Sequence, residues 1–202
     1  KPNYIKVDGK PFLLIYRPGA IPQVNALVEV WREYCRKNGL GEITLGMIQS
    51  FNEFDPTIYG FDVAVEFPPH NGSFDLEPIN KTVEIINPEY QGTVVDYRDA
   101  IARSTMSPSL KHDYPWIRGC FPSWDNEARK PGAGYSFINN DREGFKEWFK
   151  QCIDYSEENP VGGDSIVFVN AWNEWAEGAH LEPDRKNGHM YLNVISEVLE
   201  SK

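Results

Sequence analysis

The chain has 202 residues, of which 41% are hydrophobic and 25% are charged, an ordinary balance for a globular protein. Its formal net charge of −10 argues against a nucleic-acid ligand, because binding to phosphates requires a basic face. No apolar run approaches the roughly 18 residues that a membrane-spanning helix needs. This length predicts one domain, residues 1–202, with a single sizeable core.

Strands and helices are predicted to alternate along the chain, from the spacing of apolar residues and from turn signals. An apolar face recurs at helical spacing after the first strand, and Asp141 is positioned to cap a later helix. In chain order we predict strand 11–16, helix 21–40, strands 43–50 and 61–69, helix 94–106, strand 116–124, helix 141–159, strand 165–172 and helix 190–201.

The strands are nearly continuous apolar runs, which favours a parallel sheet with helices outside it. An open doubly wound sheet and a barrel of the TIM type are both compatible with this order of elements. No GxGxxG motif follows a strand, which argues against a dinucleotide-binding fold. The stretch 70–92 is predicted to be a long loop between a strand and a helix.

Polar and aromatic residues follow four of the predicted strands, at the end that carries the active site in barrel enzymes. We therefore predict a rim of ligand-binding side chains at this end. Its candidates are Tyr16, Arg17, Glu66, His70, Trp124, Asp125, Trp172, Asn173, Glu174 and Trp175.

The stretch "NAWNEWAEGAHLEPD", residues 170–184, contains the strongest catalytic candidates, Glu174 and Glu177. Two nearby carboxylates titrate unequally because like charges hinder joint ionisation. One can stay protonated as an acid while the other acts as a base, which suits the cleavage of an acetal linkage. The alternative is a solvated acidic turn in which Glu177 merely caps a helix.

The aromatic candidates also have two interpretations. Trp124, Trp172 and Trp175 could stack on the apolar faces of sugars, or they could pack in the core. Asn173 could bind a sugar hydroxyl or orient Glu174, or it could satisfy backbone groups at the end of the strand.

The remaining rim candidates have structural alternatives as well. Glu66 could bind a hydroxyl, or it could form an ion pair with Arg17 or Arg98. His70 could contact a ligand or face water. Asp125 and Arg129, in "WDNEAR", could pair with each other and shape the rim.

The sequence predicts neither a metal site nor a cofactor. The three cysteines, Cys35, Cys120 and Cys152, are widely spaced and have no ligand spacing, so we expect free buried thiols in a reducing compartment. No GxSxG elbow and no phosphate-binding P-loop occurs.

The segments "YIKVDGKPFLLIYRP", "EFPP", "WDNEAR" and above all "NAWNEWAEGAHLEPD" resemble the WbsX-type family, which is labelled as glycosyltransferases of polysaccharide biosynthesis. That family is in turn similar to glycoside hydrolase family 99, the endo-α-1,2-mannosidases and mannanases. The resemblance covers nearly the whole chain, and "WNEWAEG" is its most specific part.

The resemblance implies a (β/α)8 barrel of the TIM type, of which this chain would cover about strands 4 to 8. It also implies roles for the two glutamates. Glu174 would be the base that acts on the 2-hydroxyl of the sugar, and Glu177 the acid/base at the leaving oxygen. Ala176 replaces a polar residue that is often found in the hydrolases, which could change the substrate.

These considerations leave three hypotheses. The first is a glycoside hydrolase-like enzyme that cleaves an α-linked polysaccharide of the mannose or rhamnose type. The second is a glycosyltransferase of O-antigen or capsule assembly, although no DxD motif or phosphate-binding glycine loop is present. The third is a carbohydrate-binding remnant without turnover.

The resemblance also suggests a bacterial, cytoplasmic protein whose ligand is an oligosaccharide or a polysaccharide. If the barrel is incomplete, its exposed sheet edges are expected to require the N-terminal half of the barrel or a second copy of the chain as partner.

Overall fold

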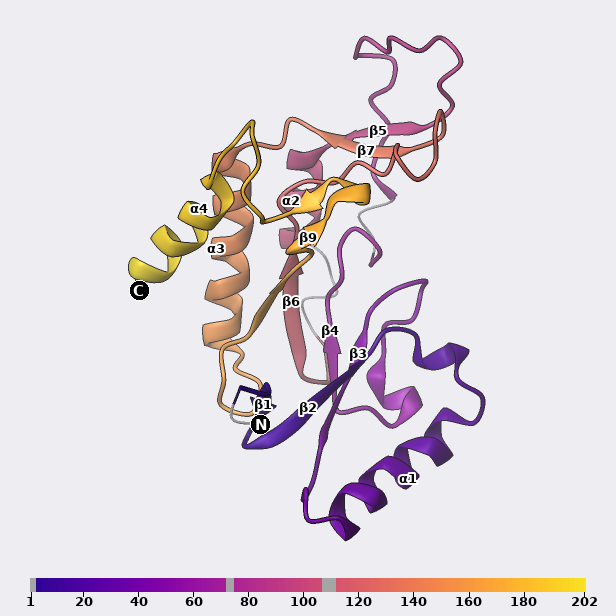
Figure 1. Cartoon of the computed structure of the whole chain (residues 1–202), viewed down its shortest axis with the longest axis vertical. Coiled ribbons are helices and arrows are strands. Elements are labelled where there is room, and N and C mark those ends of the chain that lie inside the picture. Colours follow the sequence, from indigo (N-terminus) through magenta and orange to yellow (C-terminus); the bar gives the residue numbers. More distant parts are fainter. Residues whose placement is uncertain (1–2, 72–74, 107–111) are drawn as a thin grey trace. The chain divides into compact units, whose positions relative to one another are not determined.

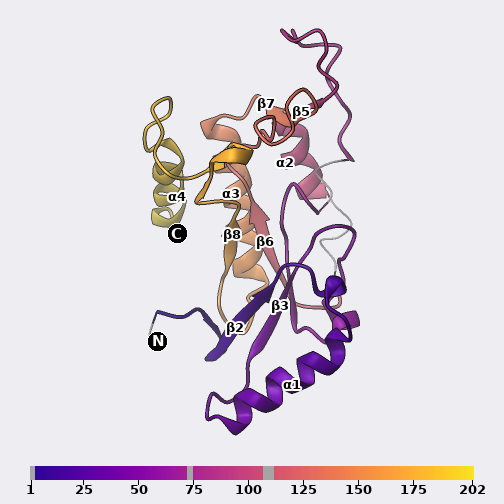
Figure 2. The same ribbon diagram turned by 45° about the vertical axis from the view of Figure 1, so that its right-hand side comes forward.

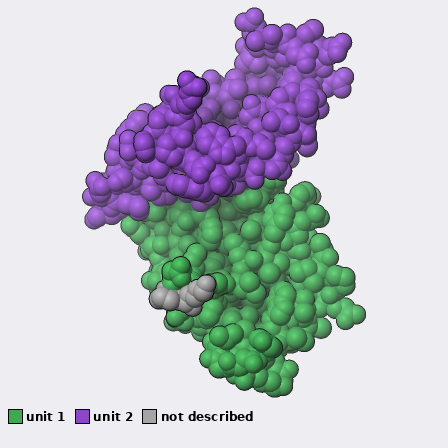
Figure 3. All heavy atoms as spheres, in the orientation of Figure 1, with its two compact units in different colours: residues 1–71, 111–119, 153–168 green, residues 72–110, 120–152, 169–202 purple. Residues whose placement is uncertain are grey.

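The computed structural model describes residues 3–71, 75–106 and 112–202. The chain divides into two compact units, coloured separately in Figure 3. Unit 1 consists of residues 1–71, 111–119 and 153–168, and unit 2 consists of residues 72–110, 120–152 and 169–202. In the part of the chain that is described, no helix combines the length and the apolar character needed to cross a membrane.

A six-stranded sheet begins in unit 1 and has the order β1-β2-β3-β4-β6-β8 (Figure 1). The pairs β2–β3, β3–β4 and β4–β6 are parallel, as predicted, whereas β1 pairs with β2 antiparallel. The predicted strands are confirmed, although most of them are shorter than expected. The strands are β1 (Lys6–Val7), β2 (Lys10–Ile15), β3 (Thr44–Ile48), β4 (Val63–Val65), β6 (Trp116–Cys120) and β8 (Val167–Val169).

Side chains of β2 alternate between the two faces of this sheet, as the pleat of a strand requires. Leu13 and Ile15 pack with the cluster that contains Leu45 and Met47 of β3, together with helix α1 (Val24–Lys37). Phe12 and Leu14 belong to the opposite cluster, which includes residues of β4 and β6. The sheet of unit 1 is therefore covered on one face by α1.

A buried ion pair connects β4 to β6 within unit 1. Glu66 Oε2 lies 2.7 Å from Arg118 Nε, and both side chains are almost completely buried. The same oxygen accepts a hydrogen bond from the Gly119 N–H, and Asn71 donates to the other oxygen. The expected pairing of Glu66 with Arg17 or Arg98 is wrong, because Arg118 on the neighbouring strand presents its guanidinium directly to the carboxylate.

Unit 2 contains a second parallel pair of strands, β5 (Thr93–Asp96) and β7 (Tyr135–Ile138). The prediction of a helix over 94–106 is wrong at its start. Residues 94–96 form a strand, and helix α2 begins only at Tyr97 and continues to Met106. Sequence analysis missed β7, whose four residues are too few to give a clear alternation.

Helix α3 (Arg142–Glu158) lies between α2 and α4 (Met190–Glu200) in Figures 1 and 2. The unit 2 part of α3 contacts both neighbours. On one side the Trp148 Nε1–H donates to Ser104 Oγ of α2, and on the other the ring of Phe145 meets Tyr191 of α4 edge-on. Burial of these aromatic side chains builds the core of unit 2.

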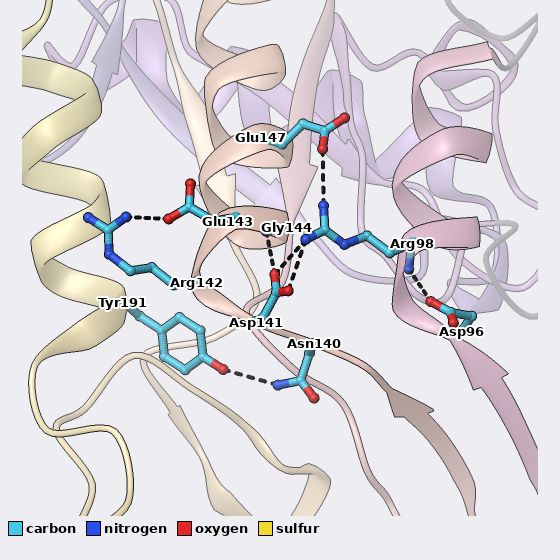
Figure 4. A network of polar contacts seen from close by, with 9 residues as sticks. All are labelled: Asp96, Arg98, Asn140, Asp141, Arg142, Glu143, Gly144, Glu147 and Tyr191. Carbon is cyan, nitrogen blue, oxygen red and sulfur yellow. Dashed lines mark hydrogen bonds and ion pairs between the residues drawn. The ribbon is translucent and has the colours of Figure 1, made fainter. Parts of the chain in front are cut away.

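Asp141 caps α3, as predicted, and it also connects this helix to α2 (Figure 4). Its Oδ1 accepts a hydrogen bond from the Gly144 N–H at 2.6 Å, and Arg98 Nη2 lies 2.7 Å away. Arg98 reaches Glu147 as well, one turn further along α3. The Gly144 N–H and then Arg98 lower the pKa of the Asp141 carboxyl, so the carboxylate at this helix start stays ionised.

The buried pair in unit 1 gives a first prediction. We expect Glu66→Gln to reduce the free energy of unfolding by about 3 kcal/mol or more, because glutamine leaves the Arg118 charge buried without a counterion. Thermal or urea unfolding of the intact protein measures this difference. The exposed Glu29→Gln on α1 serves as a control, and an equally small effect of both changes would contradict the prediction.

Candidate functional site

The two candidate glutamates lie on a short hairpin that follows β8. Strand β9 (Asn173–Glu174) pairs antiparallel with β10 (Ala179–His180), and the 3-10 turn η5 (Trp175–Glu177) connects them. The predicted strand 165–172 is therefore wrong at its end, since β8 stops at Val169. Gly178 returns the chain with a φ of 60°, a left-handed conformation that favours glycine.

Two hydrogen bonds attach this hairpin to the segment 123–125 of the same unit. The Asp125 N–H donates to the carbonyl oxygen of Glu177 at 2.8 Å, and the Ser123 hydroxyl donates to the carbonyl oxygen of Gly178. A Cβ atom on residue 178 would lie only 3.0 Å from the Asp125 nitrogen. Glycine at this position thus permits the close approach of the two segments.

The loop that follows Asp125 is held in place by its own side chains. Asn126 is buried and its Oδ1 accepts a hydrogen bond from the Tyr135 N–H at 2.7 Å. The Glu127 carboxylate accepts from the N–H groups of Gly132 and Gly134. The backbone at Arg129 is therefore fixed, since its own N–H donates to the Asn126 carbonyl oxygen.

Arg129 bridges the two candidate glutamates. Its Nη2 lies 2.7 Å from Glu174 Oε1 and its Nη1 lies 3.3 Å from Glu177 Oε1. The sequence suggested that Arg129 could pair with Asp125. Among the described residues, the ion pairs of Arg129 are instead with the two glutamates. The Asp125 carboxylate instead accepts hydrogen bonds from the Ser136 hydroxyl and the Glu127 N–H.

The two glutamates have unlike surroundings. The Glu174 side chain is 40% exposed and that of Glu177 is 19% exposed. Burial raises the pKa of Glu177, and the neighbouring Glu174 raises it further, while Arg129 and Lys130 oppose the rise. Glu177 thus keeps its proton to a higher pH than an ordinary glutamate, as a general acid requires.

The predicted tryptophans divide between the surface and the core. Trp172 and Trp175 are about half exposed and are available to a ligand beside Asn173, which is also exposed. Trp124 is 1% exposed and packs edge-on against Phe121. The possible stacking of Trp124 on a sugar is therefore wrong in this structure, and the alternative holds, because its indole is buried in the core.

His180, Glu182 and Asp184 support the hairpin. The Trp175 ring stacks on His180 with centroids 3.8 Å apart, and its Nε1–H donates to Glu182 Oε2 at 2.8 Å. His180 Nε2 lies 3.1 Å from Asp184 Oδ2. Burial raises the pKa of Asp184, but hydrogen bonds from Asn187, His180 and the Lys186 N–H outweigh it and lower this pKa to about 2.

The other rim candidates form an aromatic cluster in unit 1. Tyr16 meets Phe51 and Phe67 edge-on, and His70 stacks on both phenylalanine rings. The Arg17 guanidinium lies 4.4 Å from the centre of the Phe51 ring. Phe51 was not predicted as a rim residue, although it lies within three residues of the end of β3.

This cluster belongs to unit 1, and the glutamate pair belongs to unit 2. Glu66 does not join the aromatic cluster as an exposed ligand contact, because its carboxylate is buried against Arg118.

An apolar groove of about 800 Å³ also occurs in unit 1, lined by α1, β2 and the segments next to them. Its described lining includes Leu13, Trp31, Tyr34 and Leu40 and no carboxylate, so it lacks the pair of carboxyl groups that glycoside hydrolysis uses. Within the described residues, no group of three or more histidine, cysteine or acidic side chains is arranged to hold a metal ion. Among the described residues, none of the three cysteines forms a disulfide bond.

A family model described as "Glycosyltransferase WbsX" matches residues 1–195. Two curated relatives, both called "Uncharacterized protein WxcX" and from two strains of Xanthomonas campestris pv. campestris, are each 37% identical over 198 residues. The match covers 98% of this chain and 28% of each relative. The chain therefore spans little more than a quarter of the length of these relatives.

Solved structures resemble the fold over almost the whole chain. A "Glycoside hydrolase-like protein" has a TM-score of 0.66 at 18% identity, and the match covers 98% of this chain and 56% of that protein. The GH99 endo-alpha-mannosidase from Bacteroides thetaiotaomicron has a TM-score of 0.55 at 15% identity, with 100% of this chain and 58% of the mannosidase covered. At these identities the likeness concerns the fold.

The depressed pKa of Asp184 leads to a second prediction. A carboxyl whose pKa is lower in the folded state stabilises the fold above its unfolded pKa, and this contribution is lost as the pH falls through about 2. We expect Asp184→Asn to destabilise the protein by about 1 kcal/mol at pH 7, after a discount for solvent screening. Unfolding curves at pH 7, 5, 4 and 3 measure the difference.

The gap between the native protein and Asp184→Asn is expected to begin closing below about pH 4. Asp113→Asn, an exposed change, is the matched control. A gap that stays constant over this whole range would show that the carboxylate charge does not stabilise the loop.

Proposed function

Because the chain belongs to the glycosyltransferase WbsX family, we propose that it contributes the reacting carboxylates, Glu174 and Glu177, of a carbohydrate-active enzyme. The observation that carries this proposal is the pair of glutamates on one guanidinium, with one carboxylate more enclosed than the other. Such a pair can supply one base and one acid to the same glycosidic bond.

The proposed first step uses both side chains. The Glu174 carboxylate takes the proton of the sugar 2-hydroxyl, whose oxygen bonds to the anomeric carbon as the bond to the leaving oxygen breaks. Glu177 gives its proton to that leaving oxygen, which suits a carboxyl whose pKa burial raises. The product of this step is a 1,2-anhydro sugar.

In the second step, Glu177 takes a proton from water as the water oxygen bonds to the anomeric carbon. The bond between that carbon and the 2-oxygen breaks, and Glu174 returns the proton to the 2-oxygen. Both carboxyls then have their starting protonation states, and the net reaction is hydrolysis of the glycosidic bond without a metal or a cofactor.

The exposed indoles next to Glu174 support a polysaccharide substrate. Trp172 and Trp175 present aromatic surface to solvent beside the glutamates, and Asn173 is exposed between them. Aromatic faces pack on the apolar faces of sugar rings, whereas amides and carboxylates bind the hydroxyls. We therefore propose an α-linked polysaccharide of the mannose or rhamnose type as substrate.

The proposal for the whole protein is a (β/α)8 barrel to which this chain contributes about strands 4 to 8. The parallel strands and the partial coverage of the solved structures support it. Tyr16, Arg17 and His70 follow β2 and β4, at strand ends of the kind that carry ligand-binding residues in such barrels. The rest of the barrel, or a second copy of the chain, is the proposed partner.

A second candidate function is transfer of a sugar from a nucleotide donor in O-antigen or capsule assembly. The description of the family as glycosyltransferases favours it directly. A third is sugar binding without turnover, for which the exposed Trp172 and Trp175 would suffice. Only the first candidate uses the unequal surroundings of both glutamates.

The third prediction separates these candidates. The full-length protein is incubated with labelled α-linked oligosaccharides and, in parallel, with nucleotide sugars and acceptors. We expect released sugar without nucleotide, and a loss of about 100- to 10,000-fold in kcat for both Glu174→Gln and Glu177→Gln. Glu158→Gln, an exposed change at the end of α3, is expected to keep full activity.

Each other outcome selects a different function. Released nucleotide with a lengthened acceptor would establish the transferase. Oligosaccharide binding that survives Glu177→Gln, with no turnover of either panel by the native protein, would establish the binding function.

A further inference from the structure

We propose that Arg129 is a positioning residue of the carboxylate pair, which aligns Glu174 and Glu177 on the two arms of its guanidinium and sets how the pair shares one proton. This inference rests on the proposed function of the pair. Arg129 acts through the two glutamates and is not itself assigned a contact with the reacting atoms.

Arg129 contacts both carboxylates through one guanidinium. The two nitrogens of one planar fork each face a different carboxylate, at 2.7 Å for Glu174 and 3.3 Å for Glu177. Arginine suits such a bridge because its donors have a fixed mutual geometry. The two acidic side chains are therefore aligned relative to each other and not only to the backbone.

Both ends of the bridge between Arg129 and the glutamates are anchored to the backbone. Arg129 lies in the loop whose backbone Asn126 and Glu127 hold, and Glu177 belongs to a turn whose carbonyl oxygen accepts a hydrogen bond from the Asp125 N–H. A casual surface ion pair joins two mobile side chains and contributes little. Here the guanidinium extends from one fixed segment to another that lies 45 residues away in the sequence.

The charges of the Arg129 cluster do not balance when both carboxyls are ionised. One guanidinium faces two carboxylates, so one negative charge is left over when both carboxyls are ionised. Binding of a single proton makes the cluster neutral. Burial favours Glu177 as the holder of that proton, and the charge of Glu174 acts in the same direction. Arg129 and, more weakly, Lys130 oppose this, while the Asp125 carboxylate is engaged with Ser136 and the Glu127 N–H.

Arg129 therefore limits how far the pKa of Glu177 rises. Removal of its positive charge would raise the pKa of Glu177, and the acid would remain protonated to a higher pH. The alkaline limb of the rate profile reports that proton, because Glu177 must be protonated to act as the acid.

The fourth prediction is a shift of this limb. In the full-length enzyme we expect Arg129→Gln to move the alkaline limb of kcat/KM upward by about 0.5 to 1 pH unit. Because the carboxylates lose their alignment, kcat/KM near neutral pH should also fall by about 10- to 100-fold. Arg129→Lys should keep the limb near its native position but lose much of the rate, since it retains the charge without the fork.

The matched control is Arg36→Gln. Arg36 has 48% side-chain exposure, against 50% for Arg129, and it pairs with Glu42 at the surface of unit 1. This change removes the same charge from an ordinary surface ion pair, so we expect neither the limb nor the rate to change.

The outcomes for Arg129 and for the proposed function can be told apart. If both glutamates prove essential but Arg129→Gln leaves the alkaline limb in place, the inference is wrong and the proposed function stands. If activity survives the loss of either glutamate, the proposed function fails.

A second readout needs no turnover. The pH dependence of carbodiimide labelling of Glu177, followed by mass spectrometry of its peptide, reports the same proton in the native and Arg129→Gln proteins. An unchanged labelling profile would overturn the inference even if no substrate is found.

Discussion

The geometry of the candidate site depends on the hydrogen bond from the Asp125 N–H to the Glu177 carbonyl oxygen. This bond joins the "WDNEAR" segment to the "NEWAEG" hairpin, which are about fifty residues apart in the chain. Gly178 has no side chain, which permits the contact, and the Ser123 hydroxyl reinforces it. Without this attachment, the guanidinium of Arg129 would have no fixed position relative to the two glutamates.

The consequence of this attachment is electrostatic. Two carboxylates near one guanidinium form a cluster that retains a proton more readily than a balanced ion pair would, and the more enclosed Glu177 is the favoured site for it. An acidic chain with a net charge of −10 thus contains a local arrangement suited to proton transfer. The half-exposed indoles of Trp172 and Trp175 border the same hairpin, in keeping with the proposed sugar ligand.

Two other ion pairs in the protein, one buried and one exposed, have a structural role. Glu66 and Arg118 satisfy each other inside unit 1, and Asp141 joins two helices of unit 2 through Arg98. These contacts hold elements together and leave no carboxylate exposed for chemistry at Glu66. The buried Glu66 carboxylate thus differs from those of Glu174 and Glu177, whose side chains remain partly open to solvent.

Local features of the sequence were sufficient to predict most strands, the helices at 141–159 and 190–201, and the cap at Asp141. Apolar periodicity and capping depend on residues within a few positions of one another, so they can be recognised without a fold. The closeness of Glu174 and Glu177 follows from the same kind of local spacing. The exposed state of Trp172 and Trp175 agrees with one of their two possible interpretations.

The partners of these residues depended on the folded chain. Spacing could not predict that Glu66 pairs with Arg118 or that Arg129 pairs with both glutamates. It also could not predict that Trp124 packs in the core. Each joins residues separated by dozens of positions, and several arginines and aromatic residues could have served equally well. Backbone hydrogen bonds and packing between distant segments select one partner, because only the folded chain determines which side chains come within a few ångströms of each other.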